Sequence, residues 1–122
     1  MKYCSVITRW GNEAMQFLNN EDLQCIIIFN EGAPEELADM AILHEPAPIL
    51  KEIKVGDIIE LCGKHLKISA IGEEAMETLR DLGHCTLSFK GGSKPERPGC
   101  IMLEGKPVVP GDFYIGGYIK IY

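Results

Sequence analysis

Residues 25–48 read CIIIFNEGAPEELADMAILHEPAP, and this stretch decides how the rest of the chain is organised. It opens on Cys25–Phe29, a short run rich in β-branched residues that is typical of a buried strand. The cluster Asn30–Pro34 then ends the strand, because glycine and proline close together favour a turn. Pro34 also suits the first turn of a helix, where its missing N–H is not needed, and residues 35–40 are predicted to form that helix.

The predicted helix leads back through a short apolar segment, Ala41–Leu43, to His44. Pro46 and Pro48 follow at once, and each lacks the backbone N–H that a regular strand would use. The stretch therefore predicts one imidazole at the end of a strand, where two prolines restrict the backbone. Such a position can hold a reactive side chain at the rim of a fold.

The composition is that of a soluble globular protein, with 122 residues of which 46% are hydrophobic and 25% charged. This length predicts a single domain over residues 1–122. There are 18 acidic and 12 basic residues, so the net charge is −6. Nucleic acid is not expected as a partner, because a protein that binds a phosphate backbone needs a basic face. A partner with a positive docking surface fits better.

The chain also lacks the signals of a membrane or secreted protein. No apolar run approaches the ~20 residues that span a bilayer, and the first ten residues include no long apolar segment of the signal-peptide kind. The five cysteines are widely spaced and form no C-x-x-C pair. We therefore predict neither a zinc site nor a disulfide framework, and we expect a cytoplasmic protein.

Short elements separated by glycine and proline turns make up the chain. Strands are predicted over residues 2–9, 25–29, 49–53, 58–61, 65–71, 84–89, 100–103 and 113–122. Helices are predicted over residues 12–18, 35–40 and 73–82, the last capped by Gly83. Seven or eight short strands with two or three short helices indicate a mainly β fold, an antiparallel β barrel or sandwich. No βαβ series is apparent.

Few residues are candidates for chemistry. The chain has no phosphate-binding glycine loop, no Rossmann fingerprint, no G-x-S-x-G and no H-E-x-x-H. The three histidines are His44, His65 and His84. A lone histidine is more often an ordinary surface or core residue than a reactive one, and no short-spaced pair indicates a metal site. The residues alone therefore leave the function open.

Two blocks of sequence carry a resemblance to a known family. Residues 29–37 read FNEGAPEEL and are followed by Ile42-Leu43-His44, which resembles the F-x-E-G-A-P-x-x-L…I-H signature of the glucitol/sorbitol-specific enzyme IIA of the bacterial phosphoenolpyruvate-dependent sugar phosphotransferase system. Residues 79–89 read LRDLGHCTLSF and are similar to that family's L-R-E-L-G-H-x-T-L-x-F. The early Ile7-Thr8-Arg9 and the Pro98-Gly99 step match as well, so the resemblance spans nearly the whole chain.

This resemblance implies that His44 is the phosphorylated histidine of a phosphotransferase component. The family takes a phosphoryl group from the small phosphocarrier HPr and passes it to the IIB portion of the membrane permease, so that sorbitol is phosphorylated as it enters. No metal or cofactor is implied. Members of the family can carry a second histidine two residues after the active one, and this chain has Pro46 there instead.

The chemistry fits a histidine. Its ring titrates near neutrality, so a neutral nitrogen is available as nucleophile. Transfer between two imidazoles depends on in-line placement and charge stabilisation. Candidates by residue type are His84, His65 and Lys64 for stabilising the phosphate, and Glu31 or Glu45 for holding the other ring nitrogen.

Three expectations separate the alternatives. A phosphotransfer protein should expose His44 at a rim beside an apolar docking patch. A non-catalytic binding or regulatory module on the same scaffold should bury His44 away from solvent. A metal-dependent enzyme would need His44, His65 and His84 to converge.

The terminal strand from Tyr114 to Tyr122 could pair with a second chain and form a homodimer.

Overall fold

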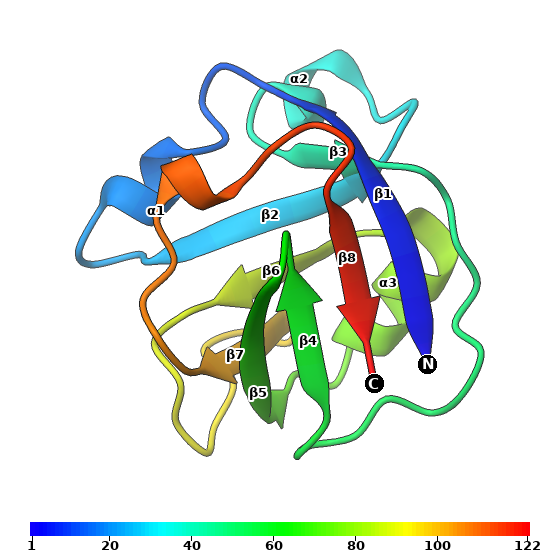
Figure 1. The fold of residues 1–122 in the computed structure, drawn as a ribbon, viewed down its shortest axis with the longest axis vertical. Coiled ribbons are helices and arrows are strands. Elements are labelled where there is room, and N and C mark those ends of the chain that lie inside the picture. The colour runs from blue at the N-terminus through cyan, green and yellow to red at the C-terminus, as the bar shows by residue number, and fades with distance from the viewer.

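The computed structural model describes all residues, 1–122, as one closed β barrel of eight strands (Figure 1). The strands are β1 (Tyr3–Trp10), β2 (Cys25–Asn30), β3 (Ile42–His44), β4 (Ile58–Leu61), β5 (Lys64–Ile71), β6 (Cys85–Ser88), β7 (Cys100–Glu104) and β8 (Tyr118–Ile121). They follow one another around the barrel in the order β1-β3-β2-β6-β7-β5-β4-β8. The prediction of a mainly β barrel is therefore confirmed.

Three short α-helices and one 3-10 turn lie outside the barrel wall. These are α1 (Gln16–Asn19), α2 (Glu35–Ala38), α3 (Ala75–Leu82) and η1 (Pro110–Asp112). Helix α3 packs against β2 and β6 and buries Ala75 and Leu79 in the core. It ends at Gly83, which has a left-handed backbone (φ 60°) and whose N–H returns to the carbonyl of Leu79. Gly83 is the predicted cap of this helix.

Alternation along the strands explains the core. Strand β1 buries Tyr3, Ser5 and Ile7 and turns the residues between them outward, because successive side chains of a strand point to opposite faces. The other strands contribute inward-facing aliphatic residues in the same way, and together they fill the barrel with one continuous cluster. The barrel is thus a packed core, and any polar group within it needs a partner.

The organising stretch forms the predicted strand, turn, helix and return. Its second strand, however, runs parallel to the first, with Asn30 opposite His44. Strands β6 and β7 are also parallel. The other neighbouring strands pair antiparallel, so the barrel is mainly antiparallel as predicted, and these two pairs are the departures from that pattern. Helix α2 is the crossover that lets β3 return in the same direction as β2.

Two predicted strands also differ from the structure. Residues 49–53 form no strand, because the prolines before them interrupt pairing. Only the N–H of Leu50 makes a backbone bond there, to the carbonyl of Lys2 just before β1. The terminal strand is shorter than predicted, since Tyr114–Gly117 form a turn in which Gly116 has a positive φ of 89°. The helix predicted over residues 12–18 is reduced to turns and the short α1.

Strand β8 has no free edge. It pairs with β1 on one side and with β4 on the other, which closes the barrel and brings the two chain ends close together (Figure 1). The reason for expecting a homodimer through this strand is therefore removed, because a strand that is paired on both sides offers no backbone groups to a second chain.

Candidate functional site

The imidazole of His44 lies inside the barrel, at the last position of β3. Its side chain shares the inner face with Ile42, two residues earlier, and is 0% exposed. Strand β1 lies beside it, with Ile7 opposite His44 in the pairing, and the end of α3 covers it from outside. Three segments far apart in sequence therefore enclose one ring.

Both ring nitrogens of His44 have hydrogen-bond partners. Nε2 lies 2.7 Å from the backbone carbonyl oxygen of Gly83. Nδ1 lies 2.9 Å from Oγ of Ser5 and 3.0 Å from the backbone carbonyl oxygen of Glu45. A carbonyl only accepts, and one lies at each ring nitrogen, so the single hydrogen of the neutral ring can serve only one of them. The Ser5 hydroxyl donates its hydrogen to the Glu45 carbonyl, and its oxygen can accept from Nδ1 when that nitrogen carries the ring hydrogen.

Burial keeps this imidazole neutral. It lowers the pKa of His44 below the ordinary value of 6.5, and the carbonyls of Gly83 and Glu45 act more weakly in the opposite direction. A charged ring is disfavoured where water is excluded, so the neutral form dominates at pH 7. A neutral imidazole has a lone pair on one nitrogen, and such a nitrogen can act as a nucleophile.

The lowered pKa makes stability depend on pH. Between the pKa of the unfolded chain and the lower pKa of folded His44, the unfolded state binds more protons. This contribution to stability is therefore complete above about pH 6.5 and is lost as the pH falls through the folded pKa. We expect the free energy of unfolding to decrease from about pH 7 to about pH 5, a window above the titration of ordinary carboxylates.

The measurement is urea unfolding of the wild type, His44→Gln and His65→Gln across that pH range. His65 is the matched control because its side chain is 62% exposed. The slope of stability against pH should become smaller in His44→Gln and stay unchanged in His65→Gln. Equal slopes in the wild type and His44→Gln would contradict this account of the buried ring.

Two further polar side chains next to His44 have unsatisfied atoms. The ring of Tyr3 meets the imidazole edge-on, with ring centroids 6.4 Å apart, and its hydroxyl is buried without a hydrogen-bond partner. Burial raises the pKa of Tyr3 to about 12, so the phenol stays neutral. The Oδ1 atom of Asn30 is also buried without a partner, and it lies against Gly83. Buried polar atoms without partners are rare in folded proteins, and they gather here around one histidine.

Only some of the predicted supporting residues lie near His44. His84 follows Gly83 directly, stacks on Phe29 with centroids 4.8 Å apart and bonds through Nδ1 to the carbonyl of Ile28. Glu45 contributes its backbone carbonyl, while its side chain is exposed. Glu31 does not hold the ring, because its carboxylate instead accepts hydrogen bonds from Thr8 and Arg9.

His65 and Lys64 lie on the opposite side of the barrel. They belong to β5, which is reached from β3 through β2, β6 and β7 in one direction and through β1, β8 and β4 in the other. His65 pairs with Glu60 at 2.9 Å, and Lys64 approaches Asp112 at 3.9 Å. Their predicted role at the phosphate is therefore wrong. The three histidines do not converge, and no group of three His, Cys, Asp or Glu side chains is arranged to hold a metal ion.

The expected exposure of His44 is also wrong. The ring is fully buried, because the end of α3 covers the end of β3. The sequence could not show this, since nothing in it indicates which helix packs over which strand. Ser5, Tyr3 and the Gly83 carbonyl were missed for the same reason. The alternation of residues 2–9 could have placed Tyr3 and Ser5 on one face, but not opposite His44.

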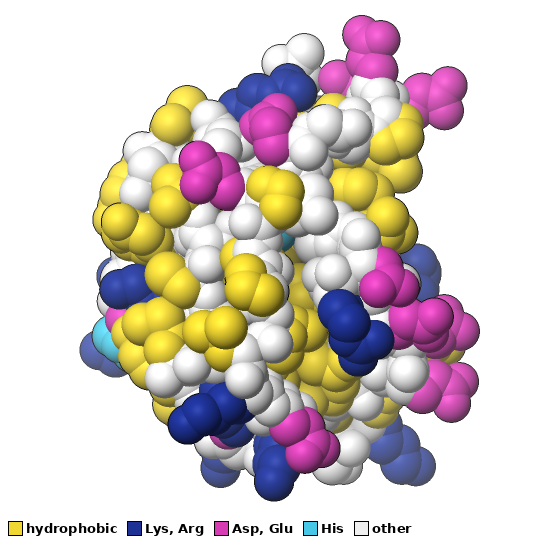
Figure 2. All heavy atoms as spheres, turned by 90° about the vertical axis from the view of Figure 1, so that its right-hand side faces the viewer, with side chains coloured by type: hydrophobic (Ala, Val, Ile, Leu, Met, Phe, Trp, Pro, Cys, Tyr) yellow, Lys and Arg dark blue, Asp and Glu magenta, His cyan; other side chains and the backbone are white.

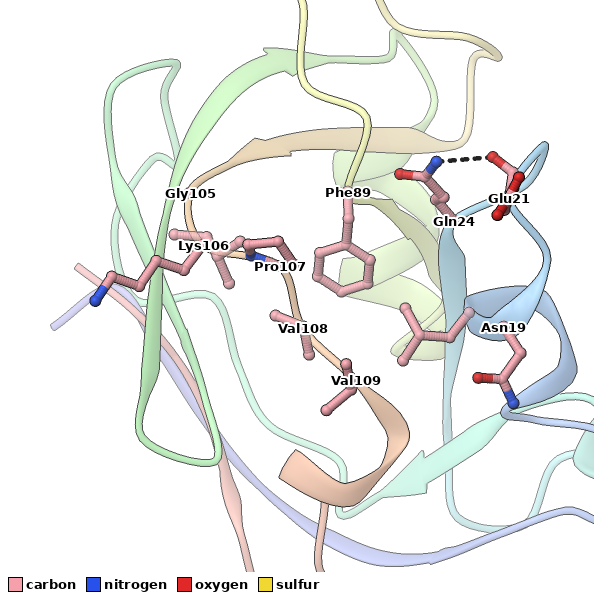
Figure 3. Close-up of a pocket in the computed structure, with 11 residues that line it drawn as sticks. Asn19, Glu21, Gln24, Phe89, Gly105, Lys106, Pro107, Val108 and Val109 are labelled. Atoms are coloured by element: carbon pink, nitrogen blue, oxygen red, sulfur yellow. Dashed lines mark hydrogen bonds between the residues drawn. The ribbon is translucent and has the colours of Figure 1, made fainter.

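A surface hollow lies away from His44. It has a volume of about 530 Å³ and lies between residues 18–24 and residues 105–109. Figure 3 shows Phe89, Val108 and Val109 lying around it, with the Gln24 side chain bonded to the backbone of Glu21. Gln24 precedes β2, whereas His44 pairs with Asn30 at the far end of that strand. The hollow contains no histidine and contributes nothing to the site.

Helices of this length do not cross membranes, and none in this chain is long and apolar enough to do so. The barrel resembles a solved structure, that of a PTS system IIA component from Enterococcus faecalis V583, with a TM-score of 0.77. The two chains are 21% identical over 96% of this chain and 97% of the other. The two chains therefore share one barrel fold.

Comparison of sequences narrows the family. Residues 2–120 match the family model of the PTS system glucitol/sorbitol-specific IIA component. The glucitol/sorbitol-specific EIIA components of Escherichia coli (strain K12) and Shigella flexneri are each 33% identical to this chain over 118 residues, 97% of this chain and 92% of theirs. The chain belongs to the glucitol/sorbitol-specific IIA family of the phosphotransferase system, as its two sequence blocks predicted.

Proposed function

We propose that this protein carries a phosphoryl group on His44, which it accepts from phosphorylated HPr and passes to the IIB portion of a sorbitol permease. Membership in the IIA family supports the carrier role. The observation that favours His44 is that it alone among the three histidines is fully buried, with both ring nitrogens held in place. A ring that is fixed and neutral is prepared to act as a nucleophile.

Nε2 is the nitrogen that we assign to the phosphoryl group. Nδ1 faces the hydroxyl of Ser5, which belongs to β1, and the carbonyl of Glu45, which directly follows β3 and whose N–H bonds to the Val6 carbonyl of β1. Nε2 faces only the Gly83 carbonyl, which belongs to the cap at the end of α3. Uncovering Nε2 therefore requires a shift of one helix end, whereas uncovering Nδ1 would require breaking the sheet.

The transfer needs few steps. With the ring hydrogen on Nδ1, where the Glu45 carbonyl and the Ser5 oxygen accept it, withdrawal of the Gly83 carbonyl leaves the lone pair of Nε2 accessible. The lone pair of Nε2 then attacks phosphorus in line with the donor's P–N bond, and that bond's electron pair returns to the donor imidazole. The same exchange in the reverse sense passes the group to IIB. His84, which follows Gly83, is the nearest candidate for stabilising the phosphate.

The proposed partners fit the charge of the chain. With a net charge of −6, it favours encounters with carriers that present a basic face. HPr as the donor, the IIB portion as the acceptor and the cytoplasm as the location follow the biology of the family. Recognition of sorbitol belongs to the permease. A homodimer stays a prediction, without the free strand edge that first suggested it.

A non-catalytic binding module remains the second candidate, because the burial of His44 is what such a module was expected to show. Family membership favours phosphoryl transfer, which requires that the end of α3 at Gly83 moves away from His44. The test is incubation with phosphoenolpyruvate, enzyme I and HPr, followed by NMR of the phosphorylated protein. We expect one phosphate on Nε2 of His44. Phosphate on Nδ1 would overturn the assignment of the nitrogen, and no phosphate with charged HPr would favour the binding module.

A further inference from the structure

The layer that covers Nε2 of His44 is thin. Gly83 has no side chain, and a Cβ atom built on it would lie 2.8 Å from Cε1 of His44 and would overlap Oδ1 of Asn30. The cover therefore consists of one backbone segment and the Asn30 side chain. Any donor that reaches Nε2 must approach over these two residues.

A surface depression lies directly beside this cover. It has a volume of about 470 Å³ and is lined by residues 29–34, which include Asn30, and by Asp81 and Leu82 at the end of α3. Two exposed leucines lie on the segments around it, since Leu82 is 46% exposed and Leu37 on α2 is 38% exposed. Exposed leucines beside a depression are typical of a surface that another protein covers.

Acidic side chains surround these leucines. Figure 2 shows hydrophobic side chains at the upper right of the molecule, between acidic side chains at the top and others lower on the right. The acidic residues on the elements that line the depression are all exposed, while the basic residues on or next to them are Arg9, which pairs with Glu31, and Arg80. These acidic residues are Glu31, Glu35, Glu36, Glu77 and Asp81.

We propose that the depression between residues 29–37 and the end of α3, hereafter the α2–α3 face, is the docking surface for the phosphohistidine-bearing donor protein. This inference rests on the proposed function. The donor should present an apolar patch surrounded by lysine or arginine, which matches the exposed leucines and the acidic rim. No other face of the molecule combines these features with a covered nitrogen of His44 directly below.

Docking here also explains how the ring becomes accessible. The unpaired Oδ1 of Asn30 makes the closed arrangement less favourable, because a buried acceptor without a donor has lost its hydrogen bonds to water. A basic group or N–H of the donor protein can supply that hydrogen bond when the Gly83 carbonyl moves away. Binding energy at the α2–α3 face would thus open the site that it serves.

The test compares two double variants that change the charge equally. Glu35→Lys/Glu36→Lys alters the α2–α3 face. Glu21→Lys/Asp22→Lys is the matched control, because these exposed acids precede β2 and lie at the opposite end of that strand from His44. For each protein, the rate of phosphorylation by charged HPr is measured at low and high salt. Phosphoramidate, a small phosphoryl donor that needs no docking surface, reports whether His44 itself stays competent.

We expect the α2–α3 variant to lose about tenfold or more in its rate with HPr at low salt and much of its salt dependence. The control should behave like the wild type, and all three should react equally with phosphoramidate. Leu82→Ser, which removes apolar surface without changing charge, should also slow the reaction with HPr. Equal rates in the α2–α3 variant and its control would overturn the docking surface alone. A wild type that accepts no phosphate from either donor would overturn the proposed function with it.

Discussion

Replacing His44 by glutamine is expected to abolish phosphoenolpyruvate-dependent phosphorylation of sorbitol by permease-containing membranes supplied with enzyme I and HPr. The loss should be at least about four orders of magnitude, the scale on which removal of a covalent nucleophile acts. Glutamine is chosen because its amide can still donate a hydrogen bond to the Gly83 carbonyl that Nε2 of His44 contacts at 2.7 Å. The fold should therefore persist while the nucleophile is lost.

The matched control is His65→Gln, on the far side of the barrel, where the histidine pairs with Glu60. It should retain the wild-type rate within about twofold, since surface substitutions remote from a site rarely disturb it. Circular dichroism would show whether both variants are folded. A folded His44→Gln protein that supports sorbitol phosphorylation at the wild-type rate would contradict the role of His44.

Replacing Gly83 by alanine is expected to destabilise the protein by roughly 2–5 kcal/mol. About 1–2 kcal/mol arises from a left-handed backbone, φ 60°, that alanine adopts poorly. A further 1–3 kcal/mol or so arises from overpacking, because the new methyl group would overlap Asn30 Oδ1 and approach Cε1 of His44. Urea unfolding would measure the change.

Gly92→Ala provides the comparison for that experiment. Gly92 also has a positive φ, 93°, but a Cβ atom there would meet nothing within 4 Å. It should lose only the backbone contribution, about 1–2 kcal/mol. The difference between the two variants isolates the contact of Gly83 with Asn30 and His44. Equal losses in both would mean that the end of α3 does not press on the imidazole.

Local patterns were enough to predict most of the elements. The β-branched run of residues 25–29, the turn at Gly32 and Pro34 and the acidic first turn of α2 depend on neighbours in sequence, and each forms as expected. The strand predicted over residues 49–53 failed, because its apolar pattern is real but Pro46 and Pro48 interrupt pairing before it. The β-propensity of a segment depends on its own residues, whereas strand pairing depends on which other segments lie beside it.

The burial of His44 and its contact with Ser5 could not be predicted from the sequence, because both depend on packing between distant segments. His44 was identified by its place after a strand and by its resemblance to a family motif. Its burial arises from α3, which begins only at Ala75 and ends over β3 at Gly83. Ser5 reaches Nδ1 only because β1 pairs with β3. No periodicity within one segment predicts which segments meet, so these contacts emerged only with the structure.

Burial of His44 bears on how the proposed transfer would proceed. In the closed protein the ring is fixed and shielded from water, and Nε2 lies 2.7 Å from the Gly83 carbonyl. Under the proposed function, opening at the end of α3 would therefore limit loading and unloading, and docking of the donor at the proposed α2–α3 face would couple that opening to the presence of a partner.

The intact mass of the protein after incubation with phosphoenolpyruvate, enzyme I and HPr tests the central claim most directly. The wild type should gain one acid-labile phosphate, an increase of about 80 Da, and His44→Gln should gain none. Phosphate on His44→Gln would move the site to another histidine. A wild type of unchanged mass, with HPr shown to be charged in the same tube, would contradict the phosphocarrier account altogether.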